Sequence, residues 1–141
     1  MYILESPLVS GYVNNYESSI NWTATYREDS DIVTPYEKWV YNDGKISQRN
    51  KRNYAFGKSK KVAWFVSNCV TTNGRLDYAL ELQKHIDVDI YGRCGPLKCK
   101  RSAKECGDML DNTYKFYLAF ENANCRDYIT EKFFVNGLGS V

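Results

Sequence analysis

The sequence predicts an α/β fold with an open parallel sheet, and three observations from its second half support this prediction. Short apolar runs that are typical of buried strands recur after residue 60. Segments with apolar side chains near helical spacing lie between and after these runs. The order is strand, helix, strand, connector, strand and helix, which is expected of parallel strands joined by crossover helices. Because ligands bind outside the carboxyl ends of such strands, we expect a functional site there.

The first part of the chain lacks this regular order. Residues 19–39 are rich in Trp, Thr, Tyr and Asp with mixed periodicity, which predicts short strands and loops. Residues 42–60 are basic and polar and have no sustained apolar period, so we interpret them as a linker. The predicted organisation is a first region at 1–41, the linker at 42–60 and a second region at 61–141.

The elements of the second region follow closely on one another. The run "KVAWFVSN" combines Val and aromatic residues and predicts a buried strand at 61–68, followed by a turn. "GRLDYALELQKH" spaces its Leu and Ala residues as a helix does, at 74–85. "IDVDIYGRCG" alternates apolar and Asp residues, which predicts a strand at the start of 86–95. A Cys- and Lys-rich connector at 96–111, a strand at 115–120 and a helix at 127–138 complete the order.

Composition excludes several classes of protein. A chain of 141 residues with 43% hydrophobic residues is able to bury a core, and its length suits one domain or parts of two. The net charge of only +2 argues against a nucleic-acid partner, although every charged residue between Gly44 and Leu76 is basic, which is compatible with a local anion site. The sequence has no apolar run near the roughly 20 residues that span a bilayer, and its start lacks the features of a signal peptide.

The cysteines indicate disulfides or buried thiols rather than a metal site. Their number, five, is odd, so one stays unpaired if the others form disulfides. Their spacing lacks the paired CxxC knuckles of zinc ribbons, and His85 is isolated from them. The sequence alone leaves their pairing open. They are Cys69, Cys94, Cys99, Cys106 and Cys125.

The stretch "FENANCRDYITEKFF" places many polar side chains where the last strand gives way to the last helix. Asp127 is in position to cap that helix, whose N-terminus would then attract phosphate. Tyr128, Glu131 and Lys132 are spaced at i, i+3 and i+4, so they would project from one helical face into one pocket. An ordinary capped helix with solvated Glu and Lys side chains is the plainer alternative, and spacing alone favours it.

Three further sites are candidates by position alone. Arg75 opens the helix after the first strand, at the corresponding corner, and is either a surface residue or part of the same crevice. The cluster "TYREDSD", with Tyr26, Arg27 and Ser30, is either a solvated loop or part of a cleft. Composition does not decide the role of Glu5 in "LESP", because a Glu before Ser-Pro is usually a surface or capping residue.

Four blocks of the sequence carry a family resemblance. In chain order they are "NWTATYREDSDIVTPYEKW", "VAWFVSNC", "VDIYGRCG" and "YKFYLAFENANCRDYITEKFF". Together they resemble the successive motifs of the α1,3-fucosyltransferases that use GDP-fucose, glycosyltransferase family 10. The first block and "EKFFVNGL" look closer to the invertebrate and plant branch, which fucosylates the innermost GlcNAc of N-glycans, than to the Lewis-type branch.

The resemblance implies a GT-B architecture of two Rossmann-like domains, with the end of the acceptor-side domain at 1–41 and the first part of the GDP-fucose-binding domain at 61–141. It implies that transfer inverts the fucose anomeric carbon and that Glu5 is the base that deprotonates the acceptor's 3-hydroxyl. It requires no metal ion, with Mn²⁺ as a stimulant. The donor-binding positions that it implies are Ser67, Asn68, Arg75, Asn122, Tyr128, Glu131 and Lys132, beside a donor or acceptor cleft at Tyr26, Arg27 and Ser30.

The resemblance also sets expectations for the intact protein. Its partners would be GDP-fucose and an N-glycan or glycoprotein acceptor, on the lumenal side of the Golgi membrane, where disulfides are expected. Membrane attachment would come only from an anchor that this chain does not contain. Members of the family are longer than this chain, so we expect a partial chain with little stability or transferase activity by itself. A Lewis-type enzyme that acts on N-acetyllactosamine and an inactive donor-binding fragment stay open as alternatives.

Overall fold

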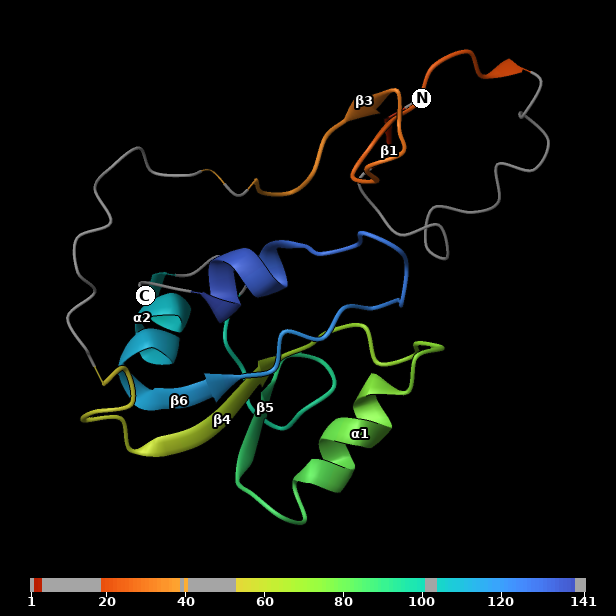
Figure 1. The fold of residues 1–141 in the computed structure, drawn as a ribbon. Coiled ribbons are helices and arrows are strands. Elements are labelled where there is room, and N and C mark those ends of the chain that lie inside the picture. The colour runs from red at the N-terminus through yellow and green to blue at the C-terminus, as the bar shows by residue number, and fades with distance from the viewer. Residues whose placement is uncertain (1, 4–18, 39, 41–52, 101–103, 139–141) are drawn as a thin grey trace.

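The computed structural model describes residues 2–3, 19–38, 40, 53–100 and 104–138 of the chain. Two parallel sheets make up its framework (Figure 1). Glu5, the expected base, and residues 42–52 of the expected linker lie outside the described residues. In the described part of the chain, no helix is long and apolar enough to cross a membrane.

The first sheet is small and consists of two-residue strands in the order β1-β2-β3. The strands are β1 (Tyr2–Ile3), β2 (Ala24–Thr25) and β3 (Ile32–Val33). Asp31 stabilises the approach to β2, because its carboxylate accepts hydrogen bonds from the backbone N–H and the hydroxyl of Thr23 at 2.8 and 2.9 Å. The prediction of short strands and loops in residues 19–39 is confirmed for the described residues.

The second sheet is the open parallel sheet that the sequence predicts. Its strands are β4 (Lys60–Phe65), β5 (Val88–Tyr91) and β6 (Tyr114–Tyr117), all parallel, in the order β5-β4-β6. Within this sheet the chain forms the central strand β4 first, then β5 on one side of it, and then crosses over to form β6 on the other side. This reversal creates a topological switch point between β4 and β6, the place where open α/β sheets bind ligands.

One helix packs against each face of this sheet. Alternate side chains of β4 point to opposite faces, so Val62 and Trp64 join Ala79 of α1 (Arg75–Leu82) in one core cluster. Ala63, from the other face of β4, joins Leu110 of α2 (Lys104–Thr113) in a second cluster. Most of α2 falls in the segment for which the sequence predicted only a connector, because its apolar positions are few and are interrupted by Cys, Gly and Asp.

The predicted helix at 127–138 is wrong in its first part. Tyr128, Ile129 and Thr130 are not helical, and the π-helix η2 spans Lys132–Gly137. Asp127 does not cap the helix, since its φ is 60° and its carboxylate accepts the backbone N–H of Glu28 at 3.2 Å. The Thr130 N–H, which a helix from 128 would leave free in its first turn, is bound instead by the carboxylate of Glu121 at 2.8 Å.

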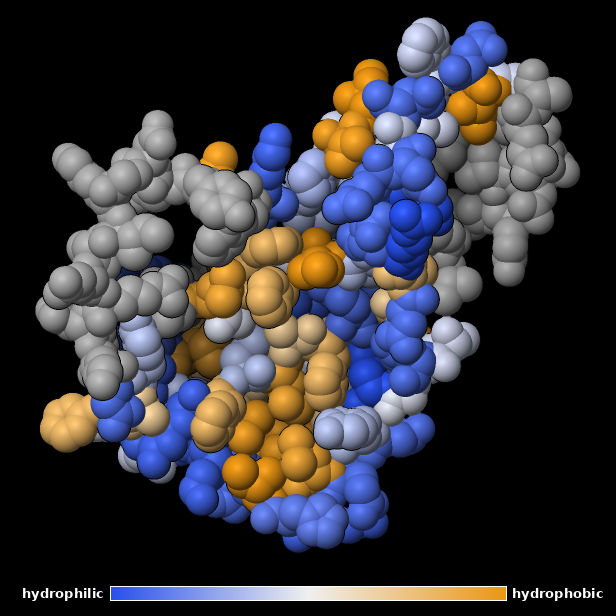
Figure 2. Space-filling model, viewed as in Figure 1, coloured by the Kyte–Doolittle hydropathy of each residue, from blue (hydrophilic) through white to orange (hydrophobic). Residues whose placement is uncertain are grey.

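Apolar side chains also gather on one outer face of the molecule. Figure 2 shows them across the middle of the view, from the position of η2 to that of α1, with hydrophilic residues around them. Exposed large apolar residues of these two helices are Tyr78, Leu80, Phe133 and Val135. The core is formed by the second sheet with α1 and α2, and the carboxyl edge of this sheet positions the candidate site.

Candidate active site at the switch point

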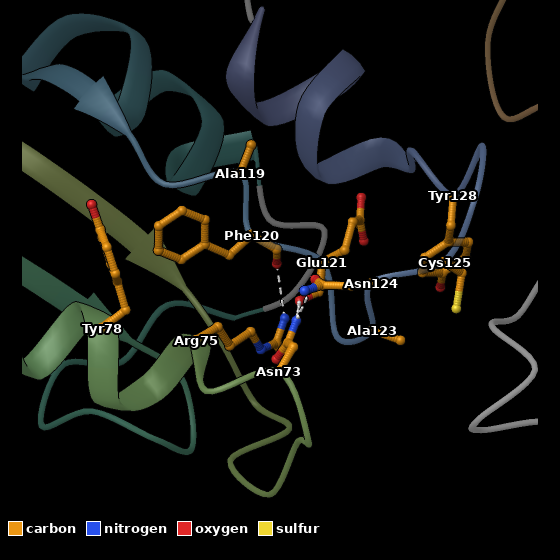
Figure 3. A pocket seen from close by; sticks show the side chains of 10 residues that line it. All are labelled: Asn73, Arg75, Tyr78, Ala119, Phe120, Glu121, Ala123, Asn124, Cys125 and Tyr128. Carbon is orange, nitrogen blue, oxygen red and sulfur yellow. Dashed lines mark hydrogen bonds between the residues drawn. The ribbon is translucent and has the colours of Figure 1, made fainter.

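A cavity of about 410 Å³ opens at the carboxyl edge of the second sheet, beside the switch point. It lies between the N-terminus of α1 and the segment that follows β6 (Figure 3). One segment follows β4 and the other follows β6, the two neighbouring strands on either side of the switch point. The lining residues are Asn73, Arg75, Tyr78, Ala119, Phe120, Glu121, Ala123, Asn124, Cys125 and Tyr128.

Arg75 joins the two strand ends below this cavity. Its guanidinium donates hydrogen bonds to the carbonyl of Phe120 at 2.8 Å and to the carbonyl of Asn68 at 2.9 Å. The residue is only 7% exposed, and burial lowers the pKa of the guanidinium, which nevertheless stays charged at neutral pH because its ordinary value is 12.5. Its Nε is buried and has no hydrogen-bond partner among the described residues.

The N-terminus of α1 contributes backbone N–H donors to the same wall. No side chain caps this helix start, because the N-cap position is Gly74, which has a φ of 65° and no side chain to accept the first N–H groups. Asn73 donates to the carbonyl of Glu121 at 2.9 Å and holds the helix start against the chain after β6. Free N–H groups at a helix start attract anions, so this wall is suited to a phosphate group.

Two buried amide oxygens of this region, Oδ1 of Asn73 and Oδ1 of Asn122, lack hydrogen-bond partners among the described residues. Asn73 is a lining residue, whereas Asn122 lies between two lining residues but not in the lining. A buried acceptor without a partner costs about 1–3 kcal/mol, so such atoms mark places where a ligand would supply the missing donor. Sugar hydroxyls and the N–H groups of a nucleobase are donors of this kind.

Lys132 is not part of the lining and contacts the lining residue Glu121. Its Nζ is 3.0 Å from a carboxylate oxygen of Glu121 and 3.4 Å from one of Glu131. Figure 3 shows the Glu121 carboxylate directed toward the C-terminal helix and away from Arg75. The Glu131 carboxyl has a lowered pKa, because the attraction of Lys132 and a hydrogen bond with Thr130 outweigh the opposing effect of burial.

Tyr128 closes the far side of the cavity and contacts the first region. Its ring is 5.0 Å from the ring of Tyr26 and 6.3 Å from that of Tyr36, and its side chain is 5% exposed. Burial raises the pKa of the Tyr26 hydroxyl. Asp29 pairs with Arg126 at 3.5 Å, and these contacts bring the first region to the rim of the cavity.

The other residues of the predicted cleft have local partners. Arg27 donates to the Asp29 carboxylate, with its Nε 2.6 Å from Oδ1, and this pairing lowers the pKa of Asp29 to about 2. Ser30 shares a hydrogen bond with the hydroxyl of Thr25. Tyr26 therefore reaches the rim of the cavity through Tyr128, whereas Arg27 and Ser30 shape the loop behind it.

The structure brings together part of the predicted donor set. Arg75 and Tyr128 line the cavity, while Ser67 and Asn68 lie in the loop that follows β4. The lining does not include Asn122, Glu131 or Lys132. The expectation that Tyr128, Glu131 and Lys132 share one helical face is wrong, because the helix starts only after Tyr128.

Eight of the ten lining residues were not among the predicted site residues, and two of these, Glu121 and Asn73, make the polar contacts described above. Glu121 follows the end of β6, and the rule that ligands bind beyond strand ends would have selected it. Asn73 precedes the uncapped helix start, and its contacts depend on a segment 48 residues later in the chain. No local signal in the sequence points to Asn73.

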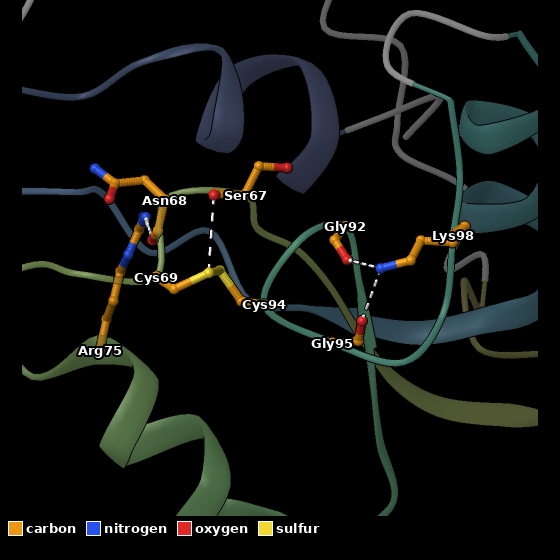
Figure 4. The surroundings of a disulfide bond; sticks show 8 residues. All are labelled: Ser67, Asn68, Cys69, Arg75, Gly92, Cys94, Gly95 and Lys98. Atoms are coloured by element: carbon orange, nitrogen blue, oxygen red, sulfur yellow. Dashed lines mark hydrogen bonds between the residues drawn. A yellow bond between two sulfur atoms is a disulfide. The ribbon is translucent and has the colours of Figure 1, made fainter.

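The second region contains two disulfides, and one of them lies beside the site. Cys69 bonds to Cys94 and Cys99 bonds to Cys106, while Cys125 is free. The expectation of one unpaired cysteine is confirmed. Figure 4 shows the first disulfide beside the Asn68 carbonyl that receives Arg75, so it ties this loop to the turn after β5. In the described residues, no three His, Cys, Asp or Glu side chains are grouped as metal ligands would be.

Comparison with known proteins gives the family. The model of the C-terminal part of glycosyltransferase family 10 (fucosyltransferase) matches residues 55–141, and that of the fucosyltransferase N-terminal region matches residues 1–37. The chain belongs to the family 10 fucosyltransferases. The family 10 resemblance seen in the four sequence blocks is thus confirmed.

Named relatives support this assignment over most of the chain. The chain is 63% identical to glycoprotein 3-alpha-L-fucosyltransferase A of Drosophila melanogaster over 140 residues, 98% of its own length and 28% of the relative's. It is 43% identical to alpha-(1,3)-fucosyltransferase fut-1 of Caenorhabditis elegans, over 94% of the chain and 31% of that protein. It is 39% identical to 4-galactosyl-N-acetylglucosaminide 3-alpha-L-fucosyltransferase FUT6 of Pongo pygmaeus, over 96% and 36%. The chain thus spans about a third of the length of these relatives.

Proposed function

We propose that this chain is part of an enzyme that transfers L-fucose from GDP-fucose to the 3-hydroxyl of the innermost GlcNAc of N-glycans, with the end of the acceptor-side domain at 1–41 and the first part of the donor-side domain at 61–141. The observation that carries the proposal is the cavity at the switch point, where an uncapped helix start and the buried cation of Arg75 meet in a family 10 fucosyltransferase chain. The helix start and Arg75 suit the diphosphate of GDP-fucose, and the buried amide oxygens nearby suit its sugar hydroxyls and nucleobase N–H groups.

In this proposal the diphosphate of the donor lies at the start of α1, near Arg75, with Lys132 as the second cation. Negative charge grows on the leaving GDP as the bond to fucose breaks, so fixed cations and N–H groups stabilise the transition state more than the ground state. Asn122 and Glu131 bind sugar hydroxyls, and Ser67 and Asn68 complete the wall after β4. The orphaned Oδ1 of Asn122 supports its role as an acceptor.

The proposal gives the proton transfer to Glu5. A carboxylate within hydrogen-bonding distance of the acceptor's 3-hydroxyl removes its proton while the oxygen attacks the sugar from the face opposite GDP. Such a base contributes about 10²–10⁴-fold to the rate. Attack from the opposite face inverts the anomeric carbon, and a GT-B arrangement of two domains would bring acceptor and donor together across a cleft beside Tyr26.

The acceptor is proposed from the relatives. Identity is higher to the Drosophila enzyme named for glycoprotein, at 63%, than to the primate enzyme named for 4-galactosyl-N-acetylglucosaminide, at 39%. This difference favours the N-glycan core of glycoproteins. The Lewis-type alternative predicts transfer to N-acetyllactosamine, and a donor-binding fragment without activity predicts binding of GDP with no transfer.

The proposal includes the cellular setting and the metal requirement of the intact enzyme. It acts in protein glycosylation on the lumenal side of the Golgi membrane, where the two disulfides are stable. Arg75 and Lys132 supply positive charge at the donor phosphates, so no metal ion is obligatory and Mn²⁺ acts only as a stimulant.

The test is a transfer assay with a chimera in which residues 1–141 replace the matching 140 residues of the Drosophila relative. We expect transfer of fucose from GDP-fucose to a core N-glycan but not to N-acetyllactosamine. Glu5→Gln should lower transfer by about 10²-fold or more without weakening GDP binding. Glu28→Gln, at an exposed position, serves as the matched control. Transfer only to lactosamine, or full activity of Glu5→Gln, would contradict the proposal.

A further inference from the structure

Glu121, which lines the cavity, forms a buried polar unit with Thr130. Thr130 is 0% exposed, and its backbone N–H and its hydroxyl both donate to Oε1 of Glu121 at 2.8 Å. The Glu121 side chain is 12% exposed, and its second oxygen is 3.0 Å from Nζ of Lys132. A single carboxylate thus holds the backbone of Thr130, its side chain and the ammonium group of Lys132.

The hydrogen bonds in this unit run in one direction. The ammonium group of Lys132 donates to the Thr130 hydroxyl at 2.9 Å, and that hydroxyl in turn donates to Glu121. The Thr130 hydroxyl also accepts a longer hydrogen bond, at 3.4 Å, from the backbone N–H of Lys132, so it acts as acceptor toward Lys132 and as donor toward Glu121. An alcohol is required for this relay, and an isosteric valine would break it on both sides.

The three contacts of the Lys132 ammonium group are unequal. Two are made to buried groups, Thr130 at 2.9 Å and Glu121 at 3.0 Å. The third is made at 3.4 Å to Glu131, whose side chain is 45% exposed. An arriving anion would first displace Glu131, which makes the longest contact and is the most exposed partner. Lys132 therefore has two fixed contacts and one exchangeable contact.

We propose that Glu121 and Thr130 are positioning residues that fix the ammonium group of Lys132 and leave its third donor, now on Glu131, for the donor phosphate. Glu121 holds Lys132 through both the direct ion pair and the Thr130 hydroxyl. The same carboxylate binds the Thr130 N–H and so keeps Thr130 out of the helix, which sets where η2 and Lys132 begin. This inference rests on the proposed donor site.

The test uses two substitutions of similar size at one position, in the purified chain. Thr130→Ser keeps the hydroxyl, whereas Thr130→Val keeps the volume and removes the relay. Reductive methylation of lysine amines, mapped by mass spectrometry, reports how accessible Lys132 is without any ligand, with the exposed Lys84 as the internal reference. Calorimetric titration with GDP reports the function, and Thr72→Val, at an exposed position, is the control.

We expect Lys132 in the parent chain and in Thr130→Ser to react more slowly than Lys84. In Thr130→Val its rate should rise about 10-fold, as expected for loss of one hydrogen bond to a charged group. GDP affinity should fall about 10-fold in Thr130→Val and Glu121→Gln, and neither change should weaken binding further in a Lys132→Ala chain.

Each other outcome has a definite meaning. Equal methylation of Lys132 in the parent and Thr130→Val, or effects on GDP affinity that add to that of Lys132→Ala, would overturn the inference. Loss of cooperative melting in Thr130→Val would also overturn it, because Thr130 would then serve stability rather than position. The expected methylation pattern in a chain that does not bind GDP would support the positioning role and refute the proposed donor site.

Discussion

The two ends of the second sheet differ in how completely their polar groups are satisfied. At the amino end, Lys60 pairs with Asp89 at 2.6 Å, and the hydroxyl of Tyr114 donates to the same carboxylate. Tyr91 joins this network through a hydrogen bond of 2.7 Å to the hydroxyl of Tyr114.

At the carboxyl end, three buried polar atoms have no partner among the described residues, in Asn73, Arg75 and Asn122. This difference indicates which end of the sheet stabilises the fold and which end binds a ligand. A closed network stabilises the fold without any ligand, whereas unpaired buried groups cost stability unless a ligand completes them. The account therefore assigns stability to the amino end and ligand binding to the carboxyl end.

The largest effect is expected from Arg75→Lys. Lysine keeps the charge but cannot donate to the carbonyls of Phe120 and Asn68 at the same time in this geometry, because it lacks the planar guanidinium group. We expect GDP affinity to fall about 100-fold and the free energy of unfolding to fall by about 2–3 kcal/mol. Calorimetry and denaturant unfolding measure the two effects. Unchanged GDP affinity would break the assignment of ligand binding to the carboxyl end.

The next effect concerns the disulfide beside the site. Replacing both Cys69 and Cys94 by Ser should lower the free energy of unfolding by about 3–4 kcal/mol, from the loop that the disulfide closes. GDP affinity should also fall several-fold, because the loop with the Asn68 carbonyl is released. The disulfide between Cys99 and Cys106 closes a shorter loop. Its replacement by two Ser residues should lower the free energy of unfolding by about 2–3 kcal/mol without changing GDP affinity. Equal effects on GDP affinity would contradict the comparison.

A smaller effect is expected from Lys132→Ala. The change leaves the buried carboxylate of Glu121 with one partner fewer and removes one of two proposed cations. We expect GDP affinity to fall about 10-fold, with Lys84→Ala as an exposed control that changes nothing. Wild-type affinity in a Lys132→Ala chain that melts normally would leave Arg75 and α1 as the whole phosphate site.

The smallest effect is expected at the amino end. Burial opposes the ionisation of Asp89, but hydrogen bonds from Lys60 and Tyr114 outweigh it and lower the pKa of this carboxyl. Because the folded pKa lies below the ordinary value of about 3.9, Asp89 stabilises the fold above that pH and loses its contribution as the pH falls through the folded pKa.

We therefore expect Asp89→Asn to cost about 1 kcal/mol at pH 7, from the weakened pair with Lys60, and almost nothing once the pH is below the folded pKa of Asp89. GDP affinity should not change. Unfolding by denaturant at several pH values, combined with one GDP titration at pH 7, checks both statements. A loss of GDP affinity would show that the two ends of the sheet are coupled.

Much of the fold could be predicted from the sequence, because local patterns carry it. The apolar run from Val62 to Phe65 and the alternation around Val88 give strands, and their order with α1 gives a parallel sheet. The start of η2 could not be predicted in this way. The residues around Thr130 in the sequence are compatible with a helix. What excludes Thr130 from it is the carboxylate of Glu121, nine residues earlier, which accepts its N–H.

The candidate site was predicted in part for a similar reason. Arg75 could be found because it opens a helix at a strand end, and it lines the cavity as expected. Asn73 depends on a contact with Glu121, 48 residues later in the chain, which spacing does not show, whereas the position of Glu121 after a strand end could have identified it. Tyr128 lines the cavity although the helix that was expected to position it begins later.

The most direct test of the central claim is a titration of the ¹⁵N-labelled chain with GDP, followed by ¹H–¹⁵N NMR. The account predicts the largest shifts for the backbone amides at the start of α1, from Arg75 to Asp77, and for those from Glu121 to Tyr128, with little change around Lys60 and Asp89. Shifts centred on the amino end of the sheet, or on the second cavity at residues 53–58, would contradict it.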